Sequence, residues 1–200
     1  VSVSFGLHAD GPVTATIVDL AMLSVYFGAE AVGLSGIEGP GEMTAAHLDK
    51  IALVKDAAAK RLGMATDGLV PVPVVVSRPA DYRSFATGAA VAASEMDLVA
   101  RVIGGRPPVV HKAYPGTVSV CTGVAASIPG TIPHQVATQR RDGELVIGHP
   151  SGVMPVQVSV SPSGEDWSVE KAAYGRTARR LAEGTAFIRS AAGADQPTQG

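Results

Sequence analysis

The segment 118–127 of this sequence contains no charged side chain, and it most constrains how the chain can fold. Its small and apolar residues lie between Gly116 and the breaker at Pro129, which predicts a helix over about 117–128. A helix without a charged face is usually buried on all sides. We therefore expect this helix to run through the centre of a domain, with the other elements packed around it.

Alternating and β-branched patterns predict strands around that helix. The expected strands cover 13–18, 24–27, 72–77, 144–147 and 156–160, with a last strand through Trp167 and Val169. Pro71 and Pro73 restrict the strand at 72–77 to a sheet edge, or to a position where a strand begins. Asp142-Gly143 predicts a hairpin turn between 140–141 and 144–147, and Ser163-Gly164 predicts another turn.

Two further helices are expected from apolar residues at helical spacing. The first covers about 45–62, with Thr44 as its N-cap and Gly63 at the position of a terminating glycine. The second covers about 95–103, where Ser94 and Asp97 resemble a capping box.

Composition and charge exclude several classes of protein. The formal net charge is −2 and there is one cysteine, so we expect no nucleic-acid partner and no disulfide. No apolar run approaches the roughly 20 residues of a membrane-spanning helix, and the first residues lack a signal-peptide pattern, so we expect no membrane partner and a cytoplasmic location. The sequence starts with Val1 and leads directly into a strand, as a part of a longer protein would.

The chain shows neither an internal repeat nor a clear linker. We therefore predict a single domain over residues 1–190 and a disordered tail over 191–200. Strands wrapped around an uncharged central helix favour an α+β fold, with the sheet forming a closed or half-closed barrel.

Few residues in the sequence point to catalysis. The five histidines are scattered and no nucleotide-binding pattern is present, so we predict neither a metal nor a cofactor. The spacing leaves a Ser/His/Asp arrangement open, although no G-x-S-x-G elbow exists. Cys121 is either a nucleophile or an inert core thiol. The second is favoured because an uncharged helix offers no cation to lower the pKa of the thiol.

The start of the uncharged helix is the most informative feature for binding. Residues 114–119 place hydroxyl groups and a glycine at a helix N-terminus, where free backbone N–H groups and the positive end of the helix dipole favour a carboxylate. An ordinary helix start has the same appearance, because Ser and Thr often cap helices. The sequence leaves both interpretations open.

The same segment resembles the PrpF family, because 111–121 is similar to the family's H-[HK]-A…G-T-G-A-V-C segment. Four further matches follow the family order, at 33–36, 77–82, 148–152 and 176–184, and Ile128-Pro129-Gly130-Thr131 fits as well. The resemblance runs from about Gly11 to Ile188. It implies a diaminopimelate-epimerase-like fold, in which a β-barrel-like sheet surrounds a central helix. It also implies that 177–183 is turn and strand, where propensity alone favours helix.

The PrpF family includes 2-methylaconitate and aconitate isomerases and 4-oxalomesaconate tautomerases. The resemblance implies cofactor-free proton transfer in an unsaturated di- or tricarboxylate, between two similar domains. The family's catalytic Lys and Cys belong to its N-terminal domain, so we assign no catalytic residue here and expect an N-terminal domain or a second chain to supply them. The expected substrate-binding residues are Met22, Ser24, Gly116, Thr117, Ser119, His149 and Ser151. For His149 and Ser151 the alternative, a turn that only redirects a strand, is slightly favoured.

Two departures from the family pattern support alternatives. Val118 replaces a glycine of the family and is expected to place a branched side chain where a ligand approaches. The stretch 19–24 lacks the Gly and Pro of the family's D-x-G-[MIN]-P segment, and Leu23 is also expected to fill space there. The leading hypothesis is the C-terminal, substrate-binding half of an isomerase or tautomerase. The alternatives are a non-catalytic subunit or binding protein, and an isomerase repurposed for a less charged substrate.

Overall fold

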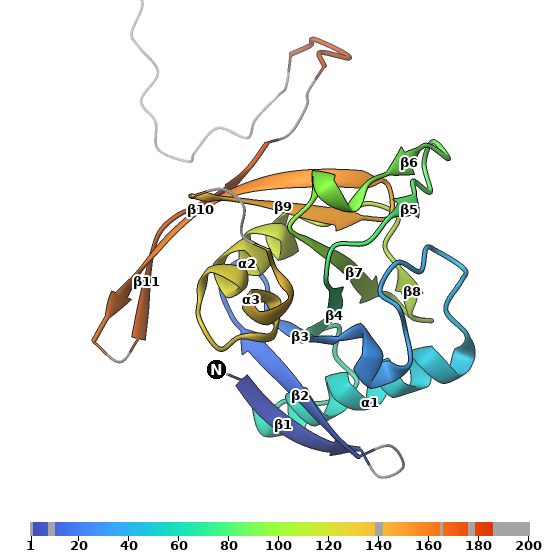
Figure 1. Cartoon of the computed structure of the whole chain (residues 1–200), viewed down its shortest axis with the longest axis vertical. Helices are drawn as coiled ribbons and strands as arrows, with labels where there is room; N and C mark the ends of the chain where they lie inside the picture. The colour runs from blue at the N-terminus through green and yellow to red at the C-terminus, as the bar shows by residue number, and fades with distance from the viewer. Residues whose placement is uncertain (1, 8–10, 139–141, 165, 176–178, 186–200) are drawn as a thin grey trace, which may run out of the picture.

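The computed structural model describes residues 2–7, 11–138, 142–164, 166–175 and 179–185. One mixed sheet dominates it (Figure 1), with the strand order β1-β2-β3-β4-β7-β9-β10-β11 and β8 paired to β7. The strands of this sheet are β1 (Ser2–Leu7), β2 (Gly11–Val18), β3 (Ser24–Gly28), β4 (Val72–Ser77), β7 (Leu98–Gly104), β8 (Val109–Val110), β9 (Glu144–His149), β10 (Gly152–Ser163) and β11 (Asp166–Tyr174). The short strands β5 (Tyr82–Arg83) and β6 (Ala90–Val91) pair separately.

The helix α2 (Gly116–Ser127) lies inside the curve of this sheet (Figure 1). Its residues from Val118 to Ala126 are all buried, as its uncharged sequence predicts. Strands β9, β10 and β11 cover one side of α2. Its other side belongs to the same apolar cluster as Tyr26 of β3 and Val74 of β4. Gly123 allows the close approach to β10, because a Cβ there would lie 3.0 Å from Val156.

The opposite face of β2, β3 and β4 is covered by α1 (Ala45–Arg61). Alternate residues of β3 face the two sides, so Val25 and Phe27 pack with α1 while Tyr26 packs with α2. The remaining helical elements are α3 (Ile132–Val136) and the 3₁₀ turns η1 (Ala29–Val32) and η2 (Ala93–Glu95). Both faces of the sheet centre are therefore buried, which explains its nearly continuous apolar strands.

The expected helices at 45–62 and 117–128 are confirmed as α1 and α2, and the strands at 13–18, 24–27, 72–77, 144–147 and 156–160 are also present. A strand through Trp167 and Val169 is present too, as β11. The strand at 72–77 lies between β3 and β7 rather than at an edge, and Pro73 is tolerated because it stands near the start of β4.

The helix expected at 95–103 is wrong. Only η2 is helical there, and 98–104 forms β7, which pairs with β4 and β9. Asp97 does not cap a helix, because its carboxylate accepts a hydrogen bond from the amide of Val146 at 2.8 Å and so joins β7 to β9. Strand β7 is buried from Leu98 to Ile103 between its neighbours, and this long-range pairing outweighs the local helical pattern.

The other turn and tail predictions have mixed outcomes. The turn at Ser163 separates β10 from β11 as expected. Strand β9 forms its hairpin with β10, through Pro150 and Ser151, rather than across Asp142-Gly143; residues 139–141 lie outside the described part. Residues 179–185 have no regular structure, so the turn and strand expected at 177–183 are not found there. The tail at 191–200 lies outside the described residues, and the single domain over 1–190 stays a prediction.

Candidate functional site

The N-terminus of α2 is not capped by a side chain. Pro115 precedes the helix without a side-chain cap, and the first helical hydrogen bond runs from the amide of Ser119 to the carbonyl of Pro115 at 2.9 Å. The amides of Gly116, Thr117 and Val118 therefore have no intrahelical acceptor. The side chain of Thr117 is exposed beside them. This group of donors at the positive end of the helix suits a carboxylate.

Gly116 is required at this helix start because Tyr174 lies directly against it. A Cβ on Gly116 would be 2.0 Å from the phenol ring of Tyr174, which comes from the end of β11. The pairing of Tyr174 with Val156 fixes the ring in this position. Sequence reasoning missed Tyr174, because the contact joins residues 58 positions apart in the chain.

The loop before β3 contacts α2 through Met22. Its carbonyl accepts hydrogen bonds from the Ser24 hydroxyl at 3.1 Å and from the Cys121 thiol at 3.3 Å. Met22 is half-buried, whereas Ser24 is fully buried and its hydroxyl is directed into its own loop. Burial raises the pKa of the Cys121 thiol, with hydrogen bonding from the loop opposing it. These contacts support the interpretation of Cys121 as a core thiol.

His149 and Ser151 form the turn between β9 and β10. The amide of Ser151 donates to Nδ1 of His149 at 3.3 Å, so the proton of a neutral ring lies on Nε2. The hydroxyl of Ser151 donates to the carbonyl of Lys112 at 2.5 Å, and the ring of His149 lies 6.2 Å from that of Tyr114. Both contacts place the turn beside the segment that leads into α2.

The imidazole of His149 is uncharged at neutral pH. It is 8% exposed, and burial, together with the nearby positive charge of Arg101, lowers its pKa to about 4. The neutral ring can donate a hydrogen bond through Nε2 but is a weak base at neutral pH.

Arg101 is a functional candidate that sequence reasoning missed. Its guanidinium is fully buried and donates to the carbonyls of Ile37 at 2.9 Å, Glu38 at 2.7 Å, Ala100 at 3.0 Å and Gly148 at 3.3 Å. Burial lowers the pKa of Arg101 to about 10, so it remains charged at neutral pH. Arg101 thus holds the loop at 37–38 against the strand that leads into His149.

Tyr82 also holds the turn between β9 and β10 in place. Its ring lies 5.0 Å from the Arg101 guanidinium, and its single O–H proton is shared between the carbonyls of His149 at 2.8 Å and Gly152 at 2.6 Å. Both ends of the β9–β10 turn are therefore held by one buried phenol. A buried arginine within a strand offered no local signal of this role.

Two expected side chains do not face a ligand. Ser119 is buried, and its hydroxyl donates to the carbonyl of Gly116 at 2.8 Å. Val118 is 2% exposed and packs in the core cluster with Tyr26, so the expectation that it narrows the approach to the helix is wrong. Its Cβ points to the core because position 118 lies on the inner side of α2. This finding removes one of the two arguments for a non-catalytic protein.

No group of three or more His, Cys, Asp or Glu side chains suited to a metal ion occurs among the described residues. Within the same part of the chain, no helix is long and apolar enough to cross a membrane.

The comparison with protein families decides the relationship. The model of the PrpF protein family matches residues 3–189. The chain belongs to the PrpF family. The 3-methylitaconate isomerase of Eubacterium barkeri is 38% identical over 193 residues, which cover 90% of this chain and 49% of that protein. The 2-methyl-aconitate isomerase of Shewanella oneidensis is 31% identical over 189 residues, covering 90% of this chain and 46% of that protein.

Solved structures confirm the fold. A methylitaconate-delta-isomerase superposes with a TM-score of 0.74 at 30% identity, over 86% of this chain and 49% of that one. A hydroxyproline epimerase from Agrobacterium vitis superposes with a TM-score of 0.53 at 10% identity, over 84% of this chain and 43% of that one. The predicted α+β, diaminopimelate-epimerase-like fold is therefore confirmed. This chain spans about half the length of the relatives it matches.

Proposed function

We propose that this chain is the C-terminal, substrate-binding half of a cofactor-independent isomerase that shifts a proton in an unsaturated di- or tricarboxylate. The observation that carries the proposal is the uncapped N-terminus of α2, in a chain whose relatives are named isomerases of methylitaconate and methylaconitate. One substrate carboxylate would accept hydrogen bonds from the amides of Gly116, Thr117 and Val118 and from the Thr117 hydroxyl. These donors need no reorganisation when the anion arrives.

The groups around this site bind rather than transfer protons. His149 is a weak base because its pKa is about 4, and the buried Cys121 thiol has a raised pKa and donates to a carbonyl. A proton shift needs a base and an acid whose pKa values suit neutral pH. We therefore assign the proton transfer to a second half, carried by an N-terminal domain or by a partner chain.

The other predicted residues have supporting roles in this proposal. Ser24, Ser119 and Ser151 each donate to a backbone carbonyl, so they shape the loop, the helix start and the turn. Met22 would contact the bound substrate, and His149 would donate a hydrogen bond from Nε2. Tyr174, which closes over Gly116, would limit the size of the group bound there.

Calorimetric titration of this chain with 3-methylitaconate and 2-methylaconitate tests the proposal. We expect binding that Thr117→Val weakens by about 10-fold, because it removes one hydrogen bond to a charged group. Thr14→Val is the matched control, since Thr14 is an exposed threonine on β2, a strand that takes no part in the site. No binding of either acid, or equal binding by the Thr117→Val variant, would contradict the carboxylate site.

A separate experiment tests whether the chain is only half of an enzyme. The chain alone should not exchange substrate protons with deuterated water, as followed by NMR on the same two acids. Exchange catalysed by the chain alone would show that it holds its own acid and base.

A further inference from the structure

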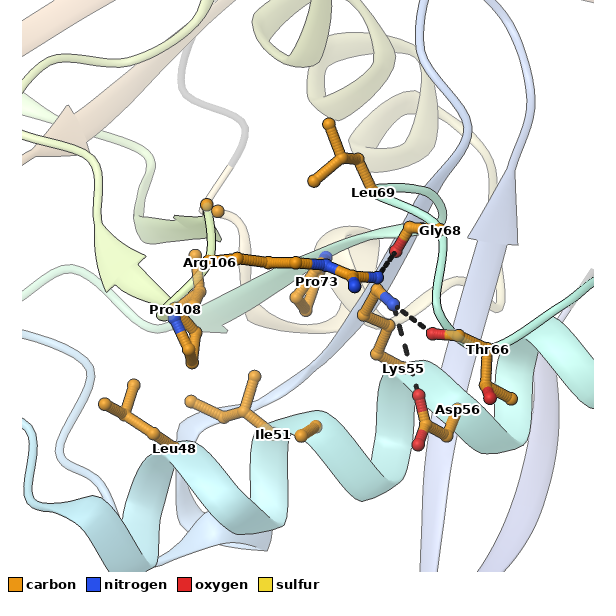
Figure 2. Close-up of a pocket in the computed structure, with 14 residues that line it drawn as sticks. Leu48, Ile51, Lys55, Asp56, Thr66, Gly68, Leu69, Pro73, Arg106 and Pro108 are labelled. Atoms are coloured by element: carbon orange, nitrogen blue, oxygen red, sulfur yellow. Dashed lines mark hydrogen bonds and ion pairs between the residues drawn. The ribbon is translucent and has the colours of Figure 1, made fainter.

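A cavity lies on the face of the sheet opposite α2, between α1 and the end of β7. Its volume is about 220 Å³. Figure 2 shows Leu48 and Ile51 rising from α1 toward Pro73 and Pro108, with Arg106 and Lys55 reaching across the opening. None of the residues in the α2 site lines this cavity.

The floor and walls of the cavity are mainly apolar. Leu48, Ile51 and Ala52 come from three positions on one face of α1, and Pro73 and Ile103 come from the ends of β4 and β7. The part of a ligand that enters deepest must therefore be aliphatic, because a polar group would lose its hydration there without new partners.

Two cations stand at the opening of this apolar space. Lys55 donates to the carbonyl of Thr66 at 3.0 Å, and Arg106 donates to the carbonyl of Gly68 at 3.4 Å. A lysine has three N–H donors and an arginine five, so both retain donors that these carbonyls do not use. Both side chains are held toward the loop at 66–68 (Figure 2), which brings their charges to the same opening.

The charge at the opening is incompletely balanced. Asp56 is the acidic residue of the lining, and its carboxylate lies 4.0 Å from the Lys55 ammonium with a side chain that is 40% exposed. The Lys55 side chain is 17% exposed, so the pair is partly buried, but a separation of 4.0 Å makes it weak. Two positive charges and one weakly paired negative charge leave a net attraction for one anionic group.

We propose that this cavity is a second ligand site, which takes a short aliphatic monocarboxylate of about six carbons. The alkyl chain lies on Leu48, Ile51 and Pro73, and the carboxylate lies between Lys55 and Arg106. An apolar protein cavity of about 150 Å³ holds benzene, so a volume of 220 Å³ accommodates a ligand of this size. A dicarboxylate fits less well, because its second charge would enter the apolar floor.

The site is tested by following amide signals of the ¹⁵N-labelled chain during titration with hexanoate. We expect saturable shifts in α1, in the loop at 66–69 and in the loop at 104–108. Hexan-1-ol, which has the same chain length without the charge, should bind about 10-fold more weakly because the two cations do not attract it. Arg106→Gln should weaken hexanoate several-fold and leave hexan-1-ol unchanged.

A filling variant gives the sharpest control. Ala52 is exposed and lines the cavity, so Ala52→Leu should reduce hexanoate binding at least several-fold while preserving the helix. Ala46→Leu makes the same change on an exposed position of α1 away from the cavity and should bind as the unmodified chain does. The site would be overturned by an absence of binding, by equal affinity for the acid and the alcohol, by undiminished binding in Ala52→Leu, or by shifts confined to the start of α2.

Discussion

Acidification should destabilise this chain through His149 well before its carboxylates titrate. The pKa of His149 in the folded chain is about 4, below its ordinary value of 6.5, because the ring is buried and Arg101 is near. The unfolded chain therefore binds a proton at this ring more tightly than the folded chain does. The contribution of the neutral ring to stability is fully present above the unfolded pKa near 6.5 and is lost as the pH falls toward 4.

The size of this effect follows from the interval between the two pKa values. Each tenfold difference in proton affinity corresponds to about 1.4 kcal/mol, so the interval from 6.5 to about 4 sets an upper limit of about 3 kcal/mol. Solvent still reaches part of the ring, which screens the effect and reduces our expectation to about 2 kcal/mol.

Urea unfolding, followed by circular dichroism at several values between about pH 7.5 and pH 4.5, measures this contribution. His149→Asn keeps an acceptor for the Ser151 amide but cannot titrate, so its free energy of unfolding should fall less with pH than that of the unmodified chain. Ser151→Ala keeps the imidazole and should retain the full pH dependence, whatever its own stability.

Glu38 also has a pKa that folding changes, and it does not confuse the comparison. Burial raises the pKa of Glu38, but hydrogen bonds from Ser35 and Gly36 outweigh it and leave the pKa below 4.5. Glu38 is present in every variant, so its contribution cancels. If His149→Asn and the unmodified chain lose stability in parallel, the argument that His149 is buried in its neutral form is refuted.

Two further changes test the contacts around the site. Arg101→Met leaves four backbone carbonyls without their donor, so the free energy of unfolding in urea should fall by about 3 kcal/mol. A loss below about 0.5 kcal/mol would show that the buried guanidinium makes no net contribution to stability. Gly116→Ala forces a methyl group against Tyr174 and should lower the free energy of unfolding by about 2 kcal/mol in the same measurement. On a Tyr174→Ala background most of this loss should disappear. Additive losses in the double-mutant cycle would contradict the contact.

The sequence was most informative where local pattern and long-range packing agree. The segment that forms α2 has no charged residue, so its burial and central position could be predicted from the sequence alone. Strand β7 shows the opposite case. Ser94 and Asp97, which precede this strand, resemble a capping box. In the structure the carboxylate of Asp97 instead accepts a hydrogen bond from the amide of Val146, a residue far away in the sequence. A local signal cannot reveal a partner at that separation.

The site was predictable to a similar degree. The helix start at Gly116 and Thr117 could be identified because free amides follow from helix geometry. The direction of a serine hydroxyl could not be predicted from the sequence, because the fold determines which acceptor lies near it. The hydroxyls of Ser24 and Ser119 both donate to backbone carbonyls. Tyr174 had no signal at all in the sequence, since its role depends on how β11 pairs with β10.

The electrostatics of the β9–β10 turn favour an incoming anion. Arg101 donates to backbone carbonyls, and none of its hydrogen bonds within the described residues ends on a carboxylate. Backbone dipoles solvate its charge, and the nearby carboxylates of Glu38 and Glu42 offset part of it, but the charge still acts on His149, whose pKa it helps to lower. A carboxylate in this position would instead favour the protonated ring. The buried cation and the positive end of α2 thus have the same sign, and the neutral His149 lets the turn donate a hydrogen bond to an anion without holding a second charge of its own.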